Sequence, residues 1–217
     1  MLPRTASRNE RGIGMELTLV QTAIMGKLPP KRVPNASVRS REYLTPVEVE
    51  KMLEAARGSG RHGRRDEALI LLAYRHGLRV GELVALRWDN VDLSAGTLHV
   101  NRIKNGTPGV HPLRGPEIRA LRQLRRDYPE TPYLFCSERK GPLTTATVRK
   151  IVARAGLLAG LTFGVHPHML RHATGYYLAA QGQDTRAIQG YLGHRAITST
   201  AVYTALAPGR YRDFWRD

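Results

Sequence analysis

The chain has 217 residues, of which 34 are Lys or Arg and 18 are Asp or Glu, so its formal net charge is +16. Positive charge in this excess attracts polyanions, which favours nucleic acid or an anionic membrane surface as the partner. No segment approaches the roughly 20 consecutive apolar residues of a membrane-spanning helix, and the nearest candidate, residues 17–25, leads to no signal-peptide cleavage site. Cys136 is the single cysteine, which excludes an internal disulfide and a cysteine-based zinc site. We expect a cytoplasmic, nucleoid-associated protein without membrane contact.

Residues 1–41 carry eight basic and two acidic side chains, with three prolines between positions 29 and 34. This composition predicts a basic, loosely ordered N-terminal arm rather than a domain. Lys31 and Arg32 are the arm residues that we assign to DNA binding. A solvated tail without function is the alternative, and the composition does not decide between the two. Residues 42–217 are expected to form the folded body.

The first part of the body predicts three helices. Thr45 and Glu48 have the spacing of a capping box at the start of a helix that is expected to run to about Arg57. Apolar residues at helical spacing predict a second helix over residues 66–76. A third helix is expected to begin near Val80.

The middle of the body changes to the alternating pattern of strands. Residues 97–103 and 110–113 flank the segment 104–107, whose Asn-Gly pair is a strong signal for a β-hairpin. Further helices are expected over residues 116–127, 145–155, 168–181 and 184–191, followed by a short helix that carries Tyr203. The expected fold class is therefore mainly α with a small antiparallel β-sheet (α+β).

Several side chains are of types that act on phosphate esters. They are Arg79, Lys104 at the hairpin tip, His168 and Arg171 on one helix face, His194, and Tyr203 near the C-terminus. Taken singly, each has a common structural explanation, since a helical arginine is usually a solvated charge and a late tyrosine usually packs in the core. His168 and His172 have the i, i+4 spacing of a zinc motif, but Met169 occupies the place of the glutamate that this motif needs. No metal site is predicted.

Taken together, Arg79…Lys104…His168-x-x-Arg171…His194…Tyr203 resembles the catalytic signature of the tyrosine recombinase, or phage integrase, family. The resemblance covers about residues 43–217 and extends to Glu82 and to the segment 191–194. Residues 102–106, 111–113 and the end of the chain from Gly209 resemble a narrower group, the small fimbrial phase-variation recombinases, which invert a promoter segment. The resemblance implies the tyrosine recombinase catalytic-domain fold for residues 42–217. Most members carry a separate core-binding domain before it, which is not expected here and which the fimbrial group also lacks.

The resemblance implies that Tyr203 attacks the scissile phosphorus and remains bonded to the 3′ phosphate. Arg79 and Arg171 would clamp the non-bridging oxygens, because a guanidinium donates two hydrogen bonds and stays charged. The phosphotyrosyl ester conserves the energy of the broken bond, so no cofactor, metal ion or ATP is implied.

The remaining residues of the signature have roles in proton transfer and positioning. His168 would be the general base toward Tyr203, and Lys104 would be the general acid for the departing 5′ oxygen. His194 would hydrogen-bond the phosphate, Glu82 would orient its neighbours, and His172 would be structural.

The implied partner is double-stranded DNA with paired recognition sites, bound by a homotetramer that is a monomer when free, with DNA-bending accessory proteins. We assign Arg102 to DNA binding. Tyr211, Phe214 and Trp215 would contact a neighbouring protomer or, equally, pack on their own core. The resemblance does not separate inversion from integration and excision. Two other functions stay open: a catalytically idle DNA-binding protein with this fold, and a metal-dependent nuclease that uses the histidines.

Overall fold

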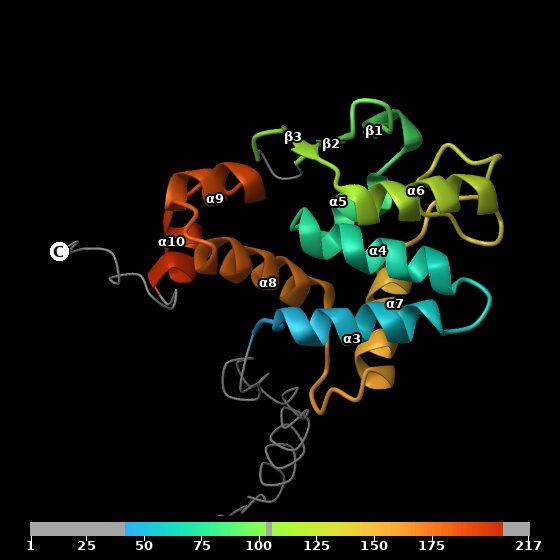
Figure 1. Ribbon diagram of the computed structural model, residues 1–217, viewed down its shortest axis with the longest axis horizontal. Coiled ribbons are helices and arrows are strands. Elements are labelled where there is room, and N and C mark those ends of the chain that lie inside the picture. Colours follow the sequence, from blue (N-terminus) through green and yellow to red (C-terminus); the bar gives the residue numbers. More distant parts are fainter. Residues whose placement is uncertain (1–41, 103–105, 206–217) are drawn as a thin grey trace, which may run out of the picture. The chain divides into compact units, whose positions relative to one another are not determined.

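The computed structural model describes residues 42–102 and 106–205, which are coloured along the chain in Figure 1. Its helices are α3 (Pro46–Arg57), α4 (Gly63–Arg75), α5 (Val80–Ala85), α6 (Gly115–Asp127), α7 (Thr145–Leu158), α8 (Pro167–Ala180), α9 (Thr185–Leu192) and α10 (Thr198–Ala205). Its strands are β1 (Val91–Asp92), β2 (Thr97–Val100) and β3 (Gly109–Pro112), with the 3-10 helix η1 (Trp88–Asn90) before β1. The predicted fold class is confirmed.

The start of α3 shows how the local sequence determines a helix boundary. The Thr45 hydroxyl accepts a hydrogen bond from the Glu48 N–H at 3.3 Å, and the Glu48 carboxylate accepts one from the Thr45 N–H at 2.8 Å. Pro46 occupies the first helical position, where its missing N–H leaves nothing unsatisfied. The predicted capping box is therefore confirmed.

The main hydrophobic core lies where α3, α4, α7 and α8 meet. Fully buried side chains come from each of these helices and include Met52, Leu69, Leu72, Val148 and Met169. Burying a side chain of this size stabilises the fold by about 1.5–3 kcal/mol. α6 packs on another side of α4, next to the sheet (Figure 1). The first half of α8 is thus held in the best-packed part of the described structure.

The sheet has three antiparallel strands in the order β1-β2-β3. β1 has two residues, too few for an alternating pattern to show in the sequence, and it was not predicted. The last residue pair of the β2–β3 hairpin is Val100 with Gly109, so β2 is shorter than the predicted run 97–103. The predicted turn at residues 104–107 includes residues outside the described part of the chain.

α9 and α10 lie side by side against α8, at the left of Figure 1. With the end of α8 they enclose a second, smaller hydrophobic cluster that consists of Ala179, Ile188, Leu192 and Tyr203. α9 ends at Gly193, whose φ of 64° is the left-handed conformation that favours glycine. This turn lets the chain reverse and brings α10 back onto α8.

Candidate active site

Arg171 lies at the centre of the site, on the first half of α8, where the residue is 1% exposed. Its Nη1 donates a hydrogen bond to the Gly77 carbonyl, and its Nη2 donates one to the Leu192 carbonyl at 2.7 Å. Gly77 begins the segment that leads to Arg79, and Leu192 begins the one that leads to His194. One buried side chain therefore ties together the three segments that carry predicted site residues.

Three more side chains complete what we call the arginine cluster: Arg79, Glu82 and Arg102 beside Arg171. The Glu82 carboxylate accepts a hydrogen bond from Arg79 Nη1 at 2.8 Å and from Arg102 Nη1 at 2.9 Å. It also accepts one from the Arg79 N–H at 2.9 Å, which fixes the start of α5. The Arg79 side chain is 27% exposed, whereas that of Arg102 is fully buried. Arg79 is therefore the arginine of this cluster that reaches the surface.

The arginine cluster holds three guanidinium groups against one carboxylate. Burial alone would raise the pKa of Glu82, but its hydrogen bonds with Arg79 and the charge of Arg102 keep that pKa below its ordinary value. Burial, followed by repulsion from Arg79 and Arg102, lowers the pKa of Arg171 to about 10, so the group is still charged at neutral pH. A bound anion would relieve this repulsion. The cluster is therefore built to attract an anion, and guanidinium groups match the geometry of a phosphate.

Tyr203 is packed on α8 in what we call the tyrosine seat, made of His172, Gly175 and Tyr176. A Cβ atom at Gly175 would lie 2.6 Å from two atoms of the Tyr203 ring, so the ring fills the space that a side chain would occupy. The Tyr176 ring meets the Tyr203 ring edge-on, with 5.1 Å between centroids. Tyr203 itself is 2% exposed. The missing side chain at Gly175 thus sets how closely α10 approaches α8.

The phenolic hydroxyl of Tyr203 points toward histidines. Its oxygen is 2.9 Å from Nδ1 of His172, and the centroids of the Tyr203 and His194 rings are 6.2 Å apart. The predicted base, His168, packs edge-on against His172 with 4.4 Å between centroids. The predicted nucleophile is therefore hydrogen-bonded to His172, which was predicted to be structural. His168, the predicted base, contacts the ring of His172.

Burial and nearby positive charge set the protonation states around this hydroxyl. Burial raises the pKa of Tyr203, although the positive charge of Arg171 acts in the opposite direction. Burial, followed by repulsion from His168 and Arg171, lowers the pKa of His172 to about 4. Burial and the nearby arginines likewise lower the pKa of His194 to about 4. Near neutral pH these two imidazoles are uncharged, and an uncharged imidazole can accept a proton.

Apart from Arg102, the predicted site residues fall into two groups. Within the described residues, Arg79, Glu82, Arg171, His172, His194 and Tyr203 are brought together, and His168 adjoins them through His172. Outside the described residues lie Lys104, Lys31, Arg32, Tyr211, Phe214 and Trp215.

Arg102 does not have the place that was predicted for it. Its guanidinium pairs with Glu82 and donates to the backbone carbonyls of His76, Gly77 and Tyr191. A side chain with no exposed surface is not available to contact DNA, so the DNA-binding prediction for Arg102 is corrected here to a positioning role. Arg102 follows Leu98 and Val100 at alternating spacing, so the strand period placed it on the buried face, while its charge favoured the surface.

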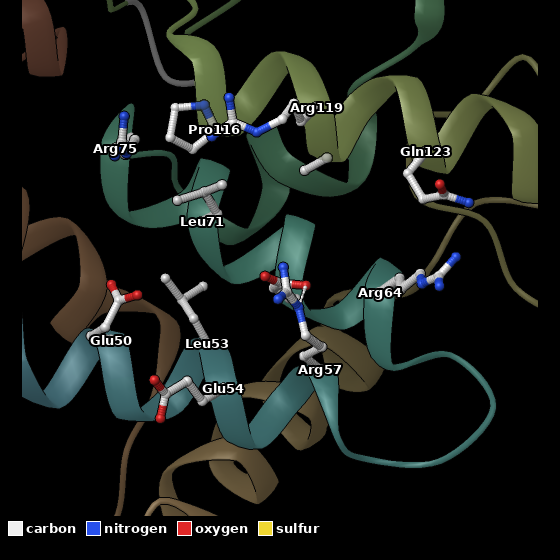
Figure 2. Close-up of a pocket in the computed structure, with 12 residues that line it drawn as sticks. Glu50, Leu53, Glu54, Arg57, Arg64, Leu71, Arg75, Pro116, Arg119 and Gln123 are labelled. Carbon is white, nitrogen blue, oxygen red and sulfur yellow. Dashed lines mark hydrogen bonds and ion pairs between the residues drawn. The ribbon is translucent and has the colours of Figure 1, made fainter.

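A hollow of about 670 Å³ lies elsewhere, between α3, α4 and α6. Figure 2 shows Glu50 and Glu54 on one side of it and Pro116 and Arg119 on the other. None of the predicted site residues lines this hollow. Within residues 42–102 and 106–205, no three His, Cys, Asp or Glu side chains gather as metal ligands. No helix in this part of the chain is both long and apolar enough to cross a bilayer.

Comparison with known proteins gives an independent view of the same chain. The phage integrase family matches residues 42–210. The type 1 fimbriae regulatory protein FimE of Escherichia coli K12 is 44% identical over 181 residues, which are 81% of this chain and 91% of that protein. The crystal structure of the XerA recombinase superposes with a TM-score of 0.69 at 29% identity and covers 86% of this chain and 65% of that one. The XerH site-specific recombinase bound to its difH substrate superposes with a TM-score of 0.65 at 27% identity, over 76% of this chain and 50% of that one.

Proposed function

The chain belongs to the phage integrase family of tyrosine-type site-specific recombinases, and we propose that Tyr203 is the nucleophile with which it breaks and rejoins DNA. Tyr203 would attack the scissile phosphorus and form a 3′-phosphotyrosyl ester, releasing a 5′ hydroxyl. Attack by a 5′ hydroxyl from another strand would reverse the step without ATP, because the ester conserves the bond energy.

One observation carries this proposal: the convergence of Arg79, Arg171, His194 and Tyr203 from four separate parts of the chain. Phosphoryl transfer is accelerated mainly by positioning and by stabilising the charge on the phosphoryl oxygens. Arg171 is held in place by backbone carbonyls, and Arg79 is partly exposed at the surface beside it. These two guanidinium groups would hold the non-bridging oxygens, so that the departing 5′ oxygen lies opposite the attacking phenol. His194 would donate a further hydrogen bond to the phosphate.

Proton transfer completes the proposed reaction. The predicted acid, Lys104, would protonate the departing 5′ oxygen from the β2–β3 connection. The base would be one of the paired imidazoles next to the phenol, the role that the family resemblance gives to His168. Glu82 would hold Arg79 in position, since its carboxylate joins Arg79 to the buried Arg102.

The proposed substrate is double-stranded DNA with paired recognition sites. The XerH neighbour was solved with its DNA substrate, and the +16 charge of this chain suits a polyanion. We propose that four copies act together on two sites and are monomers when free, with Tyr211, Phe214 and Trp215 contacting a neighbouring copy and DNA-bending proteins assisting. Lys31 and Arg32 would contact DNA from the N-terminal arm. Such an enzyme would work at the nucleoid.

The similarity to FimE, a fimbriae regulatory protein, supports inversion of a DNA segment as the outcome of recombination. Integration and excision use the same chemistry, so the residues of the site do not separate them. Inverted repeats on either side of a promoter near the gene would support inversion, whereas an attachment site at a tRNA gene would support integration.

The chemistry is tested by trapping the covalent intermediate. Duplexes that the chain binds would be selected from fragmented genomic DNA and remade with a nick a few nucleotides 3′ of each tested bond, so that the short 5′-hydroxyl fragment is lost. We expect a covalent protein–DNA adduct in EDTA, and no adduct with Tyr203→Phe. Tight binding without cleavage of any selected duplex would point instead to an idle DNA-binding protein. Cleavage that EDTA abolishes and that leaves free ends would point to a metal-dependent nuclease.

A further inference from the structure

One face of α8 is built around the Tyr203 side chain. His168, His172, Gly175 and Tyr176 recur at helical spacing, so they lie along one stripe of the helix. Gly175 and Tyr176 contact the ring of Tyr203, and His172 reaches its hydroxyl. The hydroxyl is therefore held against one imidazole nitrogen, Nδ1 of His172, by the packing of the ring itself.

We propose that His172 is the group that accepts the phenolic proton when Tyr203 attacks the phosphate. The inference rests on the proposed function, and it gives a catalytic role to a residue for which only a structural role was predicted. A base must lie within about 2.6–3.2 Å of the proton-bearing atom, and His172 meets this condition at 2.9 Å. His168 contacts the ring of His172, with 4.4 Å between centroids, whereas the histidine hydrogen-bonded to the phenol is His172.

The step balances in both directions. The O–H bond of Tyr203 breaks and its proton moves to Nδ1 of His172 while the phenolic oxygen forms the bond to phosphorus. The P–O bond to the 5′ oxygen breaks, and that oxygen takes a proton from Lys104. In the rejoining step the attacking 5′ hydroxyl gives its proton back to Lys104, the bond from phosphorus to Tyr203 breaks, and the imidazolium of His172 returns its proton to the phenol. Nδ1 can accept the proton when the neutral ring carries its own hydrogen on Nε2.

Substrate binding would strengthen this base. The charged and titratable groups around His172 are His168, Arg171 and His166 on or beside its own helix, Tyr203 on α10, and His194 between α9 and α10. After burial, repulsion within this set is what lowers the pKa of His172. A phosphate held by Arg171 would offset part of that guanidinium charge and raise the pKa again. The proton acceptor would therefore become more basic when DNA is in place.

An alternative interpretation is that the hydrogen bond between His172 and Tyr203 only holds Tyr203 in a resting position. Tyr203 is 2% exposed, so its hydroxyl must become accessible before it meets a phosphate. If the bond only held Tyr203 at rest, His172→Asn, which keeps a hydrogen-bond acceptor at this position, would leave the cleavage rate and its pH dependence unchanged. If His172 is the base, the same substitution slows cleavage, so it separates the two interpretations.

The experiment compares His172→Asn with His168→Asn. The Asn oxygen stands where Nδ1 stood, so His172→Asn keeps a hydrogen-bond acceptor but cannot take a proton. Single-turnover adduct formation on the trapping duplexes would be measured at saturating DNA over a range of pH. For His172→Asn we expect a loss of about 10²–10⁴-fold near neutral pH and a rate that rises about tenfold per pH unit, because hydroxide replaces the base. His168→Asn should lose less and should keep the shallow pH profile of the unsubstituted chain.

A second arm changes the nucleophile rather than the base. Fluorotyrosine at position 203 lowers the pKa of the phenol, so it should restore much of the rate of His172→Asn but none of the rate lost in Arg171→Ala. The steep profile appearing in His168→Asn instead, or an unchanged rate and pH profile in His172→Asn, would overturn the inference. The failure of the proposed function would look different: the unsubstituted chain would form no adduct, while the nitrogen NMR signal of His172 would still shift in Tyr203→Phe as the hydrogen bond is lost.

Discussion

The arginine cluster and the tyrosine seat are adjacent but are held in place by different means. The arginine cluster is fixed by charge-assisted hydrogen bonds, and its central residue, Arg171, projects from the part of α8 that packs in the main core. The tyrosine seat belongs to the smaller cluster of Ala179, Ile188, Leu192 and Tyr203 itself. Backbone carbonyls hold the Arg171 side chain in the arginine cluster. In the tyrosine seat, by contrast, the Tyr203 side chain is itself a large part of the packing that holds α10 on α8.

This difference indicates that α10, which carries Tyr203, can move more easily than the arginine cluster. The burial of a few side chains stabilises α10, so its position on α8 depends on about 2 kcal/mol from each of them. Displacing Arg171 would remove one hydrogen bond from each of two buried backbone carbonyls, at up to about 1–3 kcal/mol for each. We therefore expect the arginine cluster, the proposed phosphate site, to keep its shape while α10 moves the proposed nucleophile toward it or away from it.

The largest effect is expected from Arg171→Ala. The substitution removes the proposed donor to the phosphate, and it takes one donor from the Leu192 carbonyl and one from the Gly77 carbonyl, which keeps the longer hydrogen bond from Arg102 at 3.5 Å. We expect adduct formation to fall by about 10³-fold or more, and the free energy of unfolding to fall by about 2–5 kcal/mol. Adduct yield on the trapping duplexes and urea unfolding measure the two effects.

Arg171→Lys is the matched control, since it keeps the positive charge but cannot donate to both carbonyls and the phosphate at once. Its losses should lie between those of the unsubstituted chain and those of Arg171→Ala. Adduct formation by Arg171→Ala within tenfold of the unsubstituted rate would show that this guanidinium does not stabilise the transition state.

A smaller effect, confined to the tyrosine seat, is expected from Gly175→Ala. The added Cβ would lie 2.6 Å from the Tyr203 ring, so α10 must shift outward. A displacement of this kind misplaces the phenol and should lower adduct formation by about 10²-fold. Binding to the duplex should change by less than about twofold, because the substitution lies between α8 and α10 and not in the arginine cluster. Hydrogen exchange in α10 should become faster while that in α4 does not.

Gly190→Ala provides the comparison on the neighbouring helix. Gly190 lies on the exposed side of α9, and nothing would contact a Cβ atom there. Alanine should therefore leave cleavage unchanged and stabilise the helix by up to about 1 kcal/mol. Equal losses of adduct formation in Gly175→Ala and Gly190→Ala would mean that the space beneath the Tyr203 ring does not determine the cleavage rate.

The parts of the fold that could be predicted from the sequence are those with a local cause. The capping box at Thr45, the helix-ending glycines and the apolar spacing of α4 all act within a few residues, and the structure follows them. The antiparallel pairing of β2 with β3 was predicted from the alternating pattern, but the inward pairing of Arg102 with Glu82, some 20 residues earlier, was not. That ion pair depends on tertiary packing and not on the local sequence.

The same distinction between local and tertiary causes applies to the site. The order of the signature residues indicated which side chains would converge, but not which of two histidines on α8 would meet Tyr203. His168 and His172 differ by one helical turn, and the choice depends on how closely α10 approaches α8, which Gly175 determines. The same holds for Arg102, whose burial is decided by packing against Gly106 and Gly193.

The smallest effect concerns His111, which supports the arginine cluster from the sheet. His111 is 3% exposed, its ring stacks on Tyr191 with 4.0 Å between centroids, and the Tyr191 carbonyl accepts a hydrogen bond from Arg102. Burial, followed by the charges of His76 and Arg102, lowers the pKa of His111 from 6.5 to about 3. Between these two values the unfolded chain binds a proton at this ring and the folded chain does not.

The free energy of unfolding should therefore decrease as the pH falls from about 6.5 toward 3, by up to about 1.4 kcal/mol per pH unit from this residue. His111→Gln removes the titrating group, so its stability should fall less steeply over that range. Urea unfolding at pH 7, 6 and 5 measures both slopes. If the slopes coincide, His111 already binds its proton in the folded chain, and the sheet side of the arginine cluster must then be open enough to water to tolerate that charge. The frame around Arg171 would in that case be no more sheltered than the tyrosine seat, and the contrast between the two regions would not hold.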